Sequence, residues 1–323
     1  MRDTSLGLIF LSLGLVLFSS EKLAGAQSVE RQLIVSVVDS NGTPIADLDA
    51  SDFVVREDGA RREILDVRPD TERKQISLLV DTSQAAAPAV RDFKRAAKSF
   101  IETMGKGNEV SIISFGGTPR ILTEATGDQS VLNDGVDKIF SYSDTASYLL
   151  DAVTETVQGF DRRSTPRPVI VIMTTLGLDH SSNDDRGALA HLKNVGVTTH
   201  SLVLTRSTNS RSGFGQRNSP GGILGNTFIR DPFPTNNEQR NRFLDQASHE
   251  TGGRSRDLQT FSSVERAMNE LASQLENQYM LVYSRPGMLI PPEEFDVTVN
   301  REGVDVRATA VLEVERCIKE SAS

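Results

Sequence analysis

Reactive and metal-binding side chains are scarce in this sequence of 323 residues. It has one cysteine, Cys317, so no disulfide can form within the chain, and it has no tryptophan. It also lacks a Gly-x-Ser-x-Gly nucleophile elbow and a glycine loop that precedes a helix and cradles phosphate. No metal-ligand spacing relates the histidines, which are His180, His191, His200 and His249. We therefore expect that the protein is not an enzyme.

Positive charge is also in short supply. The formal net charge is -9, and no long basic stripe is present to neutralise the phosphates of a nucleic acid. Charged residues make up 24% of the chain and hydrophobic residues 37%, which is typical of a soluble globular protein. A chain of this length can form one large domain or two medium ones.

The first 26 residues have the features of a signal peptide. Leu6–Phe18 is almost wholly apolar, and Ala24-Gly25-Ala26 supplies the small residues that signal peptidase requires. The alternative is an uncleaved anchor, because Arg2 is offset by Asp3, although the apolar run is short for a bilayer span. We expect a secreted or periplasmic protein of the cell envelope, with no membrane span after cleavage of residues 1–26.

The central part of the chain, residues 73–284, alternates strands with helices. Ile76–Val80 is a short apolar run of the kind found in strands buried on both faces, and an amphipathic helix follows it. A helix over Asp184–Val195 is expected to end at Gly196. Further strands are expected at Glu109–Phe115, Pro119–Thr123, Pro168–Met173, Val197–Leu204 and Tyr279–Tyr283. This alternation predicts an α/β fold with a doubly wound, mostly parallel sheet.

Both ends of the mature chain have the pattern of β structure. In residues 27–72, the runs Phe53–Val55 and Ile64–Val67 flank a turn at 57–59. In residues 285–323, Phe295–Val299 and Val304–Val314 flank a turn at 300–303 and predict a C-terminal hairpin. Each segment is too small to bury a sheet face alone. We expect the two segments to pack together as a small module resembling a β-sandwich.

Residues 207–237 interrupt the alternation of strands and helices. They are rich in Ser, Asn, Gly, Arg and Pro, and their apolar residues have no regular spacing. A loop of this length inside a domain is functional or disordered. We expect a flexible surface loop, and the alternative is a flap that binds a partner.

The order of strands and helices, with Asp81-x-Ser83 closing the first strand of the central region, resembles the von Willebrand factor type A (VWA) domain. The segment 52–59 after the leader and the strand 279–284 before the last β segment are similar to a secreted bacterial subfamily first noticed in Acidobacteria. The resemblance implies a Rossmann-like VWA domain over residues 73–284 that binds another protein.

Domains of this family often carry a metal-ion-dependent adhesion site, in which oxygen ligands hold magnesium and a partner's carboxylate completes the coordination. The family pattern is Asp-x-Ser-x-Ser, then a threonine and an aspartate in later loops. The resemblance places ligands at Asp81, Ser83 and Ser147. Ala85 stands at the second serine and Leu176 at the second aspartate, so one hydroxyl and one carboxylate are missing.

Two hypotheses follow for this degenerate site. Asp179 could act as a substitute ligand, and a weak site for Mg²⁺ or another divalent cation would result. Alternatively, Asp81 and Ser83 tie down the turn and cap the next helix, and no cofactor binds. From the sequence alone, restoring the two ligands by Leu176→Asp and Ala85→Ser is expected to create a measurable magnesium site.

The leading functional hypothesis is a secreted or periplasmic VWA module whose adhesion site is degenerate and which binds a protein partner by surface complementarity. One alternative is a structural scaffold component of an envelope assembly. A weaker alternative is a hydrolase. The sequence does not identify the partner.

Overall fold

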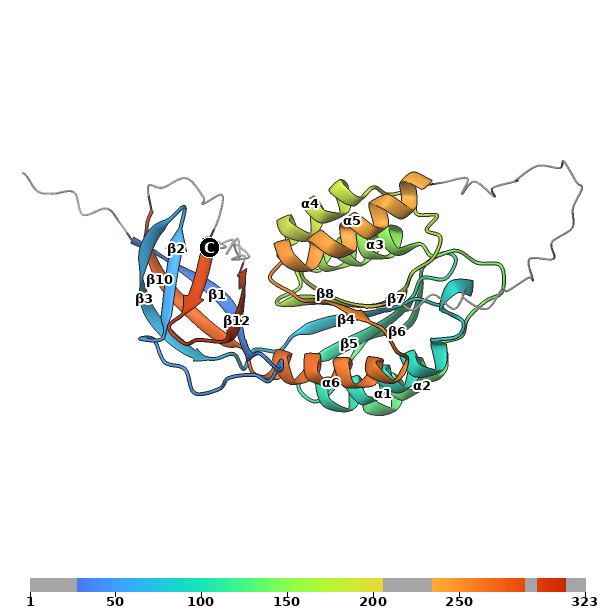
Figure 1. Ribbon diagram of the computed structural model, residues 1–323, viewed down its shortest axis with the longest axis horizontal. Helices are drawn as coiled ribbons and strands as arrows, with labels where there is room; N and C mark the ends of the chain where they lie inside the picture. The colour runs from blue at the N-terminus through green and yellow to red at the C-terminus, as the bar shows by residue number, and fades with distance from the viewer. Residues whose placement is uncertain (1–27, 206–233, 288–294, 312–323) are drawn as a thin grey trace, which may run out of the picture.

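Two sheets organise the part of the chain that the structure describes (Figure 1). The computed structural model describes residues 28–205, 234–287 and 295–311. The expected signal peptide, residues 1–26, lies outside the described residues, as does most of the expected loop at 207–237. The last four residues of that loop, 234–237, form the start of a helix.

The larger domain is built on a mixed sheet with the strand order β6-β5-β4-β7-β8-β9. Its neighbouring strands are parallel, apart from β6, which runs antiparallel to β5. Its strands are β4 (Gln75–Val80), β5 (Glu109–Ser114), β6 (Arg120–Thr126), β7 (Pro168–Thr175), β8 (Thr198–Leu204) and β9 (Ser255–Leu258). The expected α/β fold with a mostly parallel sheet is confirmed.

Helices cover both faces of this sheet, with α3, α4 and α5 on one face and α1, α2 and α6 on the other (Figure 1). The helices are α1 (Val90–Met104), α2 (Gln129–Asp137), α3 (Leu149–Arg162), α4 (Asp185–Val195), α5 (Pro234–Glu250) and α6 (Ser262–Glu276). None of the helices in the described ranges has both the length and the apolar character needed to cross a membrane.

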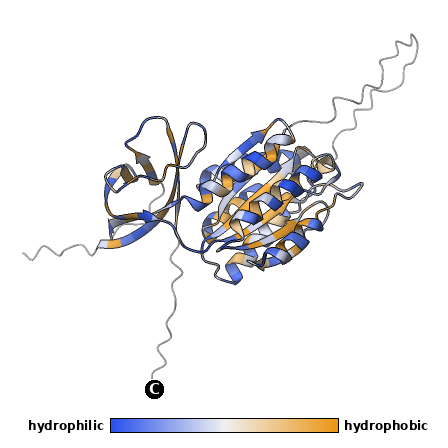
Figure 2. Ribbon diagram, turned by 90° about the horizontal axis from the view of Figure 1, so that it is seen from below, coloured by the Kyte–Doolittle hydropathy of each residue, from blue (hydrophilic) through white to orange (hydrophobic). Residues whose placement is uncertain are grey.

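Strand β4 shows why the sheet needs two helical layers. Its side chains alternate between the faces, so Ile76 and Leu78 join the core on the α1 side and Leu79 joins the core on the α3 side. All three side chains are fully buried. Figure 2 shows the same contrast, with apolar strands in the middle of the domain and helices of mixed polarity around them.

Turns and helix caps form at the residues where the local sequence predicts them. The Asp184 side chain accepts a hydrogen bond from the Gly187 N–H at 2.8 Å and caps the start of α4. The same helix ends at Gly196, which has a left-handed backbone with a φ of 72°. In the turn after β2, Asp58 and Gly59 both have positive φ values, as a two-residue hairpin requires.

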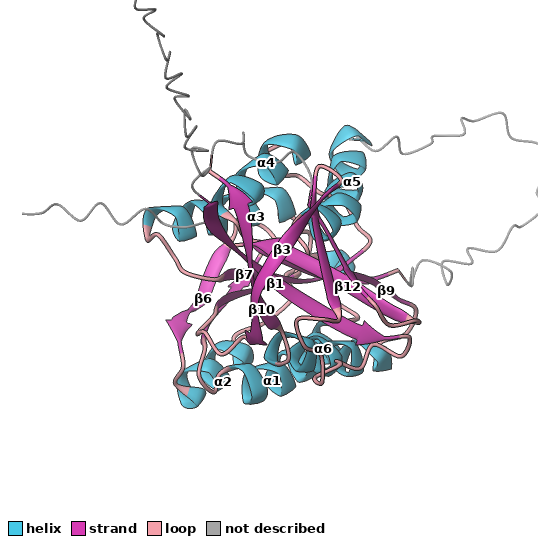
Figure 3. Ribbon diagram, turned by 90° about the vertical axis from the view of Figure 1, so that its left-hand side faces the viewer, coloured by secondary structure: helices cyan, strands magenta, loops and turns pink. Residues whose placement is uncertain are grey.

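The second sheet is antiparallel and combines both ends of the described chain, in the order β11-β2-β3-β10-β1-β12. Figure 3 shows its strands in front of the α/β domain. Its interior is apolar and includes Val35, Phe53, Tyr279 and Leu281. The strands are β1 (Ser28–Asp39), β2 (Phe53–Glu57), β3 (Ala60–Pro69), β10 (Tyr279–Pro286), β11 (Phe295–Val299) and β12 (Val304–Ala310).

The pairing of these strands corrects three expectations. Strands β11 and β12 flank a turn, but β11 pairs with β2 and β12 pairs with β1, so they are not a simple hairpin. The result is one sheet whose two end strands are joined by residues 300–303, rather than a sandwich of two sheets. Residues 279–283, expected as the last strand of the α/β sheet, belong to β10. Alternation identifies a half-buried strand, but it does not select the strand's partner.

A buried ion pair lies where the chain passes between the two sheets. Asp70 follows β3, and its N–H donates to the Gln278 carbonyl just before β10 at 2.8 Å. Its Oδ2 lies 2.6 Å from Arg167 Nη2 and 3.0 Å from Lys74 Nζ. Burial raises the pKa of Asp70, but the charges of Arg167 and Lys74 outweigh burial and hold that pKa below its ordinary value.

We expect Asp70→Asn to lower the free energy of unfolding at pH 7 by about 3–5 kcal/mol, because it leaves two buried cations without their carboxylate. The depressed pKa of Asp70 stabilises the native state above the unfolded-state value of about 3.9, and this contribution is lost as the pH falls through the native value. Below about pH 4 the original chain loses this contribution as well, so the difference in the free energy of unfolding between the two chains should become smaller. Urea unfolding at pH 7 and pH 3 measures both effects.

The matched control is Asp66→Asn, which removes an exposed aspartate that pairs with Arg68 at the surface. This control should leave the free energy of unfolding nearly unchanged. Equal effects of the two substitutions would show that the buried pair does not stabilise the junction.

Candidate functional site

The C-terminal ends of β4 and β7 bring Asp81 next to two threonines. The buried Asp81 accepts a hydrogen bond at Oδ1 from the Ser83 N–H at 2.9 Å. Its Oδ2 accepts one from the Thr174 hydroxyl at 2.7 Å and a longer one from the Thr175 N–H at 3.4 Å. Asp81 therefore ties down the turn after β4. Ser83 lies at the start of a short 3-10 helix, but its side chain makes no capping hydrogen bond.

Ser147 and Asp179 meet at the same edge of the sheet. The Ser147 hydroxyl donates to Asp179 Oδ2 at 2.9 Å, and the Leu149 N–H donates to the same oxygen at 3.0 Å. The Ser181 N–H donates to Asp179 Oδ1 at 3.0 Å. The substitute carboxylate of Asp179 thus lies in the site, where it binds the start of α3 to the loop after β7.

A buried arginine, Arg240 of α5, lies against both groups of residues, and only 1% of it is exposed. Its Nη2 donates to the Thr174 hydroxyl at 2.7 Å and also to the Thr175 carbonyl. Its Nε lies 3.9 Å from Asp179 Oδ2. Burial lowers the pKa of Arg240, and the negative charges of Asp81 and Asp179 oppose that shift. An arginine stays protonated in such a site because its unperturbed pKa is above about 12.

Sequence reasoning missed Arg240, although the sequence contains a signal for it. Phe243, Leu244 and Ala247 of α5 are buried against the sheet. Arg240 precedes them at helical spacing, so it occupies a position of the buried stripe. A charged residue at such a position needs a buried partner of opposite charge. That requirement points to the carboxylates at the end of the sheet.

The arrangement does not fit a divalent cation. Each oxygen of Asp81 and Asp179 already accepts a hydrogen bond, and the Arg240 guanidinium lies beside Asp179 and bonds to the threonine that donates to Asp81. Within the described ranges, no group of three or more His, Cys, Asp or Glu side chains is placed to hold a metal ion. Magnesium binds through negatively charged oxygens, and an adjacent positive charge opposes its binding. The Ser83 hydroxyl is buried and has no hydrogen-bond partner among the described residues.

The positions of the two missing ligands lie at the rim of the site. Ala85 and Leu176 line a pocket of about 630 Å³, together with Leu178 and Phe261. Leu176 and Leu178 are each 47% exposed. Two exposed leucines thus stand at the rim of the site, beside polar side chains that include Gln84, Asp144 and His180.

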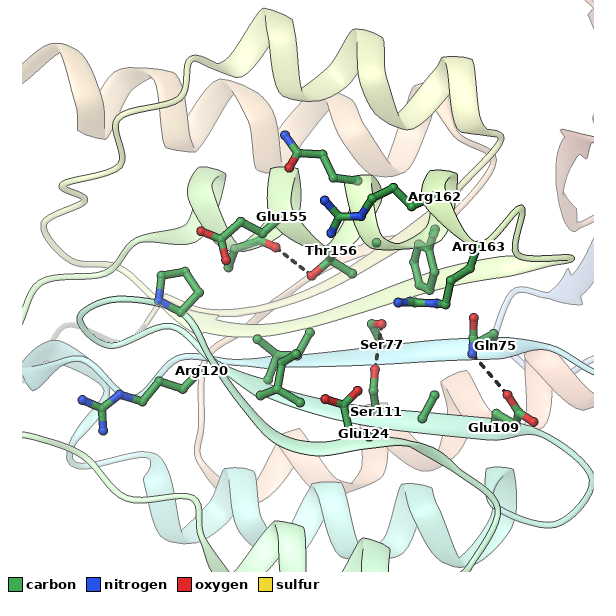
Figure 4. Close-up of a pocket in the computed structure, with 18 residues that line it drawn as sticks. Gln75, Ser77, Glu109, Ser111, Arg120, Glu124, Glu155, Thr156, Arg162 and Arg163 are labelled. Atoms are coloured by element: carbon green, nitrogen blue, oxygen red, sulfur yellow. Dashed lines mark hydrogen bonds between the residues drawn. The ribbon is translucent and has the colours of Figure 1, made fainter.

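A second pocket, of about 610 Å³, lies between α3 and strands β4, β5 and β6 (Figure 4). On its floor the hydroxyls of Ser77 and Ser111 hydrogen-bond to each other at 2.8 Å. Among the described residues that line it, none is a histidine. The two serines hydrogen-bond to each other rather than to Glu109, Glu124 or Glu155, the carboxylates that line the same pocket, so the geometry gives no support to the hydrolase alternative.

The buried histidine His200 does not supply such a base elsewhere. Its Nδ1 accepts a hydrogen bond from the Arg254 N–H at 3.1 Å. Burial and the Arg254 charge lower the pKa of His200 to about 3, so the imidazole is neutral near pH 7. Its position on β8, within the sheet, makes it a core residue.

Comparison with family models finds the von Willebrand factor type A domain over residues 76–177. This stretch runs from β4 to the loop after β7, so it contains Asp81, Ser83, Ser147 and Leu176. The α/β domain therefore has a VWA-type fold. The comparison with curated proteins found no match.

Solved structures similar to the chain include a von Willebrand factor type A protein from Catenulispora acidiphila (10% identity, TM-score 0.49, 88% of this chain and 66% of that chain covered). An aerotolerance-related membrane protein from Bacteroides fragilis is also similar (15% identity, TM-score 0.43, coverage 62% and 99%). A third is the proximal thread matrix protein 1 of mussel byssus with a zinc-occupied MIDAS motif (11% identity, TM-score 0.46, coverage 68% and 49%). None of the three carries an argument about the activity of this chain.

We expect Thr174→Val to lower the free energy of unfolding by about 1–3 kcal/mol. The substitution removes the hydroxyl that donates to Asp81 and accepts from Arg240, and it keeps the shape of the side chain. Thr175→Val is the matched control, because the Thr175 hydroxyl is buried without a partner among the described residues. Chemical denaturation should show a loss only for Thr174→Val, and equal losses would contradict the network.

Proposed function

We propose that this protein is a secreted or periplasmic module that binds a protein partner at the C-terminal edge of its VWA-type sheet, without a metal bridge. The single observation that carries the proposal is a pair of exposed leucines at this edge, Leu176 and Leu178, which we call the apolar rim; Leu176 stands at the position of a missing ligand. Exposed apolar groups at a concave site are typical of surfaces that bind other proteins.

The neighbouring loop carries two exposed aromatic side chains. Tyr142 is 45% exposed, and its N–H donates to the Thr82 carbonyl in the turn after β4 at 3.2 Å. Phe140 is also exposed. Tyrosine and phenylalanine are enriched in protein interfaces because they combine a large contact area with few rotatable bonds.

Export of the protein is the second part of the proposal. It is supported by the signal-peptide pattern of residues 1–26 and by the likeness of the sequence to the secreted subfamily first noticed in Acidobacteria. A scaffold in an envelope assembly would use the same fold without needing the apolar rim. The rim therefore favours partner binding over the scaffold.

The test is capture of partners from an envelope extract with the full chain as bait, in the presence and absence of a chelator. We expect one or more proteins to be captured equally in both conditions. The double variant Leu176→Lys, Leu178→Lys should capture about tenfold less, because it places two charges in the apolar rim.

Leu65→Lys is the matched control, because Leu65 is also a leucine that is 47% exposed but lies on β3 of the other sheet. It should capture the partner as the original chain does. Capture that survives the rim variant would favour the scaffold. Capture that is lost with the chelator would show a metal bridge.

A further inference from the structure

We propose that the Arg240 guanidinium is a built-in replacement for the metal ion at the degenerate adhesion site. It neutralises the two buried carboxylates of the site, and it keeps divalent cations out. The inference deepens the proposed function, since it explains how partner binding at this edge is independent of metal. Its test needs no partner.

The charges of the site support this assignment. Asp81 and Asp179 are each 1% exposed, and a buried carboxylate is costly unless an opposite charge or hydrogen-bond donors stabilise it. Asp179 has its ion pair with Arg240, and Arg240 also interacts with the charge of Asp81. One guanidinium thus lies next to Asp179 directly and is linked to Asp81 through the Thr174 hydroxyl.

The donors of Arg240 reach groups next to the expected ligands. Nη2 bonds to the Thr174 hydroxyl, which in turn donates to Asp81, and to the Thr175 carbonyl at the end of β7. Nε faces Asp179. A guanidinium presents several N–H donors in a fixed plane. One side chain can therefore hold α5 to the end of β7 and to the loop that carries Asp179.

The replacement differs from a metal ion in one functional respect. A metal ion at an adhesion site keeps an open position for a partner's carboxylate. Arg240 is 1% exposed, so a partner cannot reach the guanidinium directly. Binding at this edge must then use the apolar rim around Leu176 and Leu178.

This assignment changes what restoring the missing ligands should do. The sequence alone predicts that Leu176→Asp with Ala85→Ser creates a magnesium site. With Arg240 in place, we expect this double variant to remain silent, because the guanidinium still neutralises the carboxylates. Adding Arg240→Met to the double variant should create the site.

The experiment is titration calorimetry of the full chain with MgCl₂ and with MnCl₂, together with thermal unfolding at the same cation concentrations. The original chain and the double variant should show no binding at millimolar cation. The triple variant should bind the cation at least about tenfold more tightly than the double variant does, and the cation should raise the melting temperature of the triple variant. Arg242→Met in the double variant is the matched control, because Arg242 lies on the same helix with half of its side chain exposed.

Three outcomes of this titration would overturn the proposal. One is micromolar binding of Mg²⁺ by the original chain, and another is equal binding by the double and triple variants. A silent triple variant that is folded would also count against it, because removal of the guanidinium should open the site. Each of these results is independent of partner capture, so failure of the proposed function would not affect them.

A second measurement covers the case in which the triple variant does not fold. Arg240→Met alone leaves the buried Asp179 without its ion pair and should lower the melting temperature by several degrees. Adding Asp179→Asn removes that unpaired charge and should restore part of the loss. No rescue would show that the two residues are not coupled, and the proposal would be wrong.

Discussion

Backbone hydrogen bonding of β10 between β3 and β1 is the constraint on which the rest of the structure depends. Strand β3 leads into the α/β domain and β10 leads out of it, so the domain is an insertion between two neighbouring strands of the antiparallel sheet. The two connections are themselves joined by the hydrogen bond from Asp70 to Gln278. The segments before and after the α/β domain need each other, because neither has enough strands to cover an apolar face.

Buried charges mark the two opposite ends of the central strands. At the starts of β4 and β7, Asp70 pairs with Arg167 and Lys74. At the ends of the same strands, Arg240 faces Asp81 and Asp179. An isolated buried charge would cost several kcal/mol, so each cluster is stable only as a set. The two clusters hold the most apolar part of the sheet to the other sheet at one end and to α5 at the other.

The second cluster places a buried guanidinium at the C-terminal edge of the sheet. Its charges are buried, and the nearby pocket is lined by exposed leucines together with polar side chains. A stable protein complex buries on the order of 800 Å² on each partner, which is more than the pocket itself offers. The loops that carry Tyr142 and Leu178 must therefore contribute to any tight interface.

The sequence by itself determined the strands, helices, turns and most of the site. Buried runs such as Ile76–Val80 and turn residues such as Gly196 carry local signals, and the VWA pattern located Asp81, Ser83, Ser147 and the substitution at Leu176. Only the tertiary structure decided that β11 and β12 pair with other strands and that Arg240 joins Asp179. Periodicity shows which side of a helix or strand is buried, but it does not show what that side meets. Arg240 and Asp179 are far apart in the sequence, and their attraction depends on a burial that only the folded chain provides.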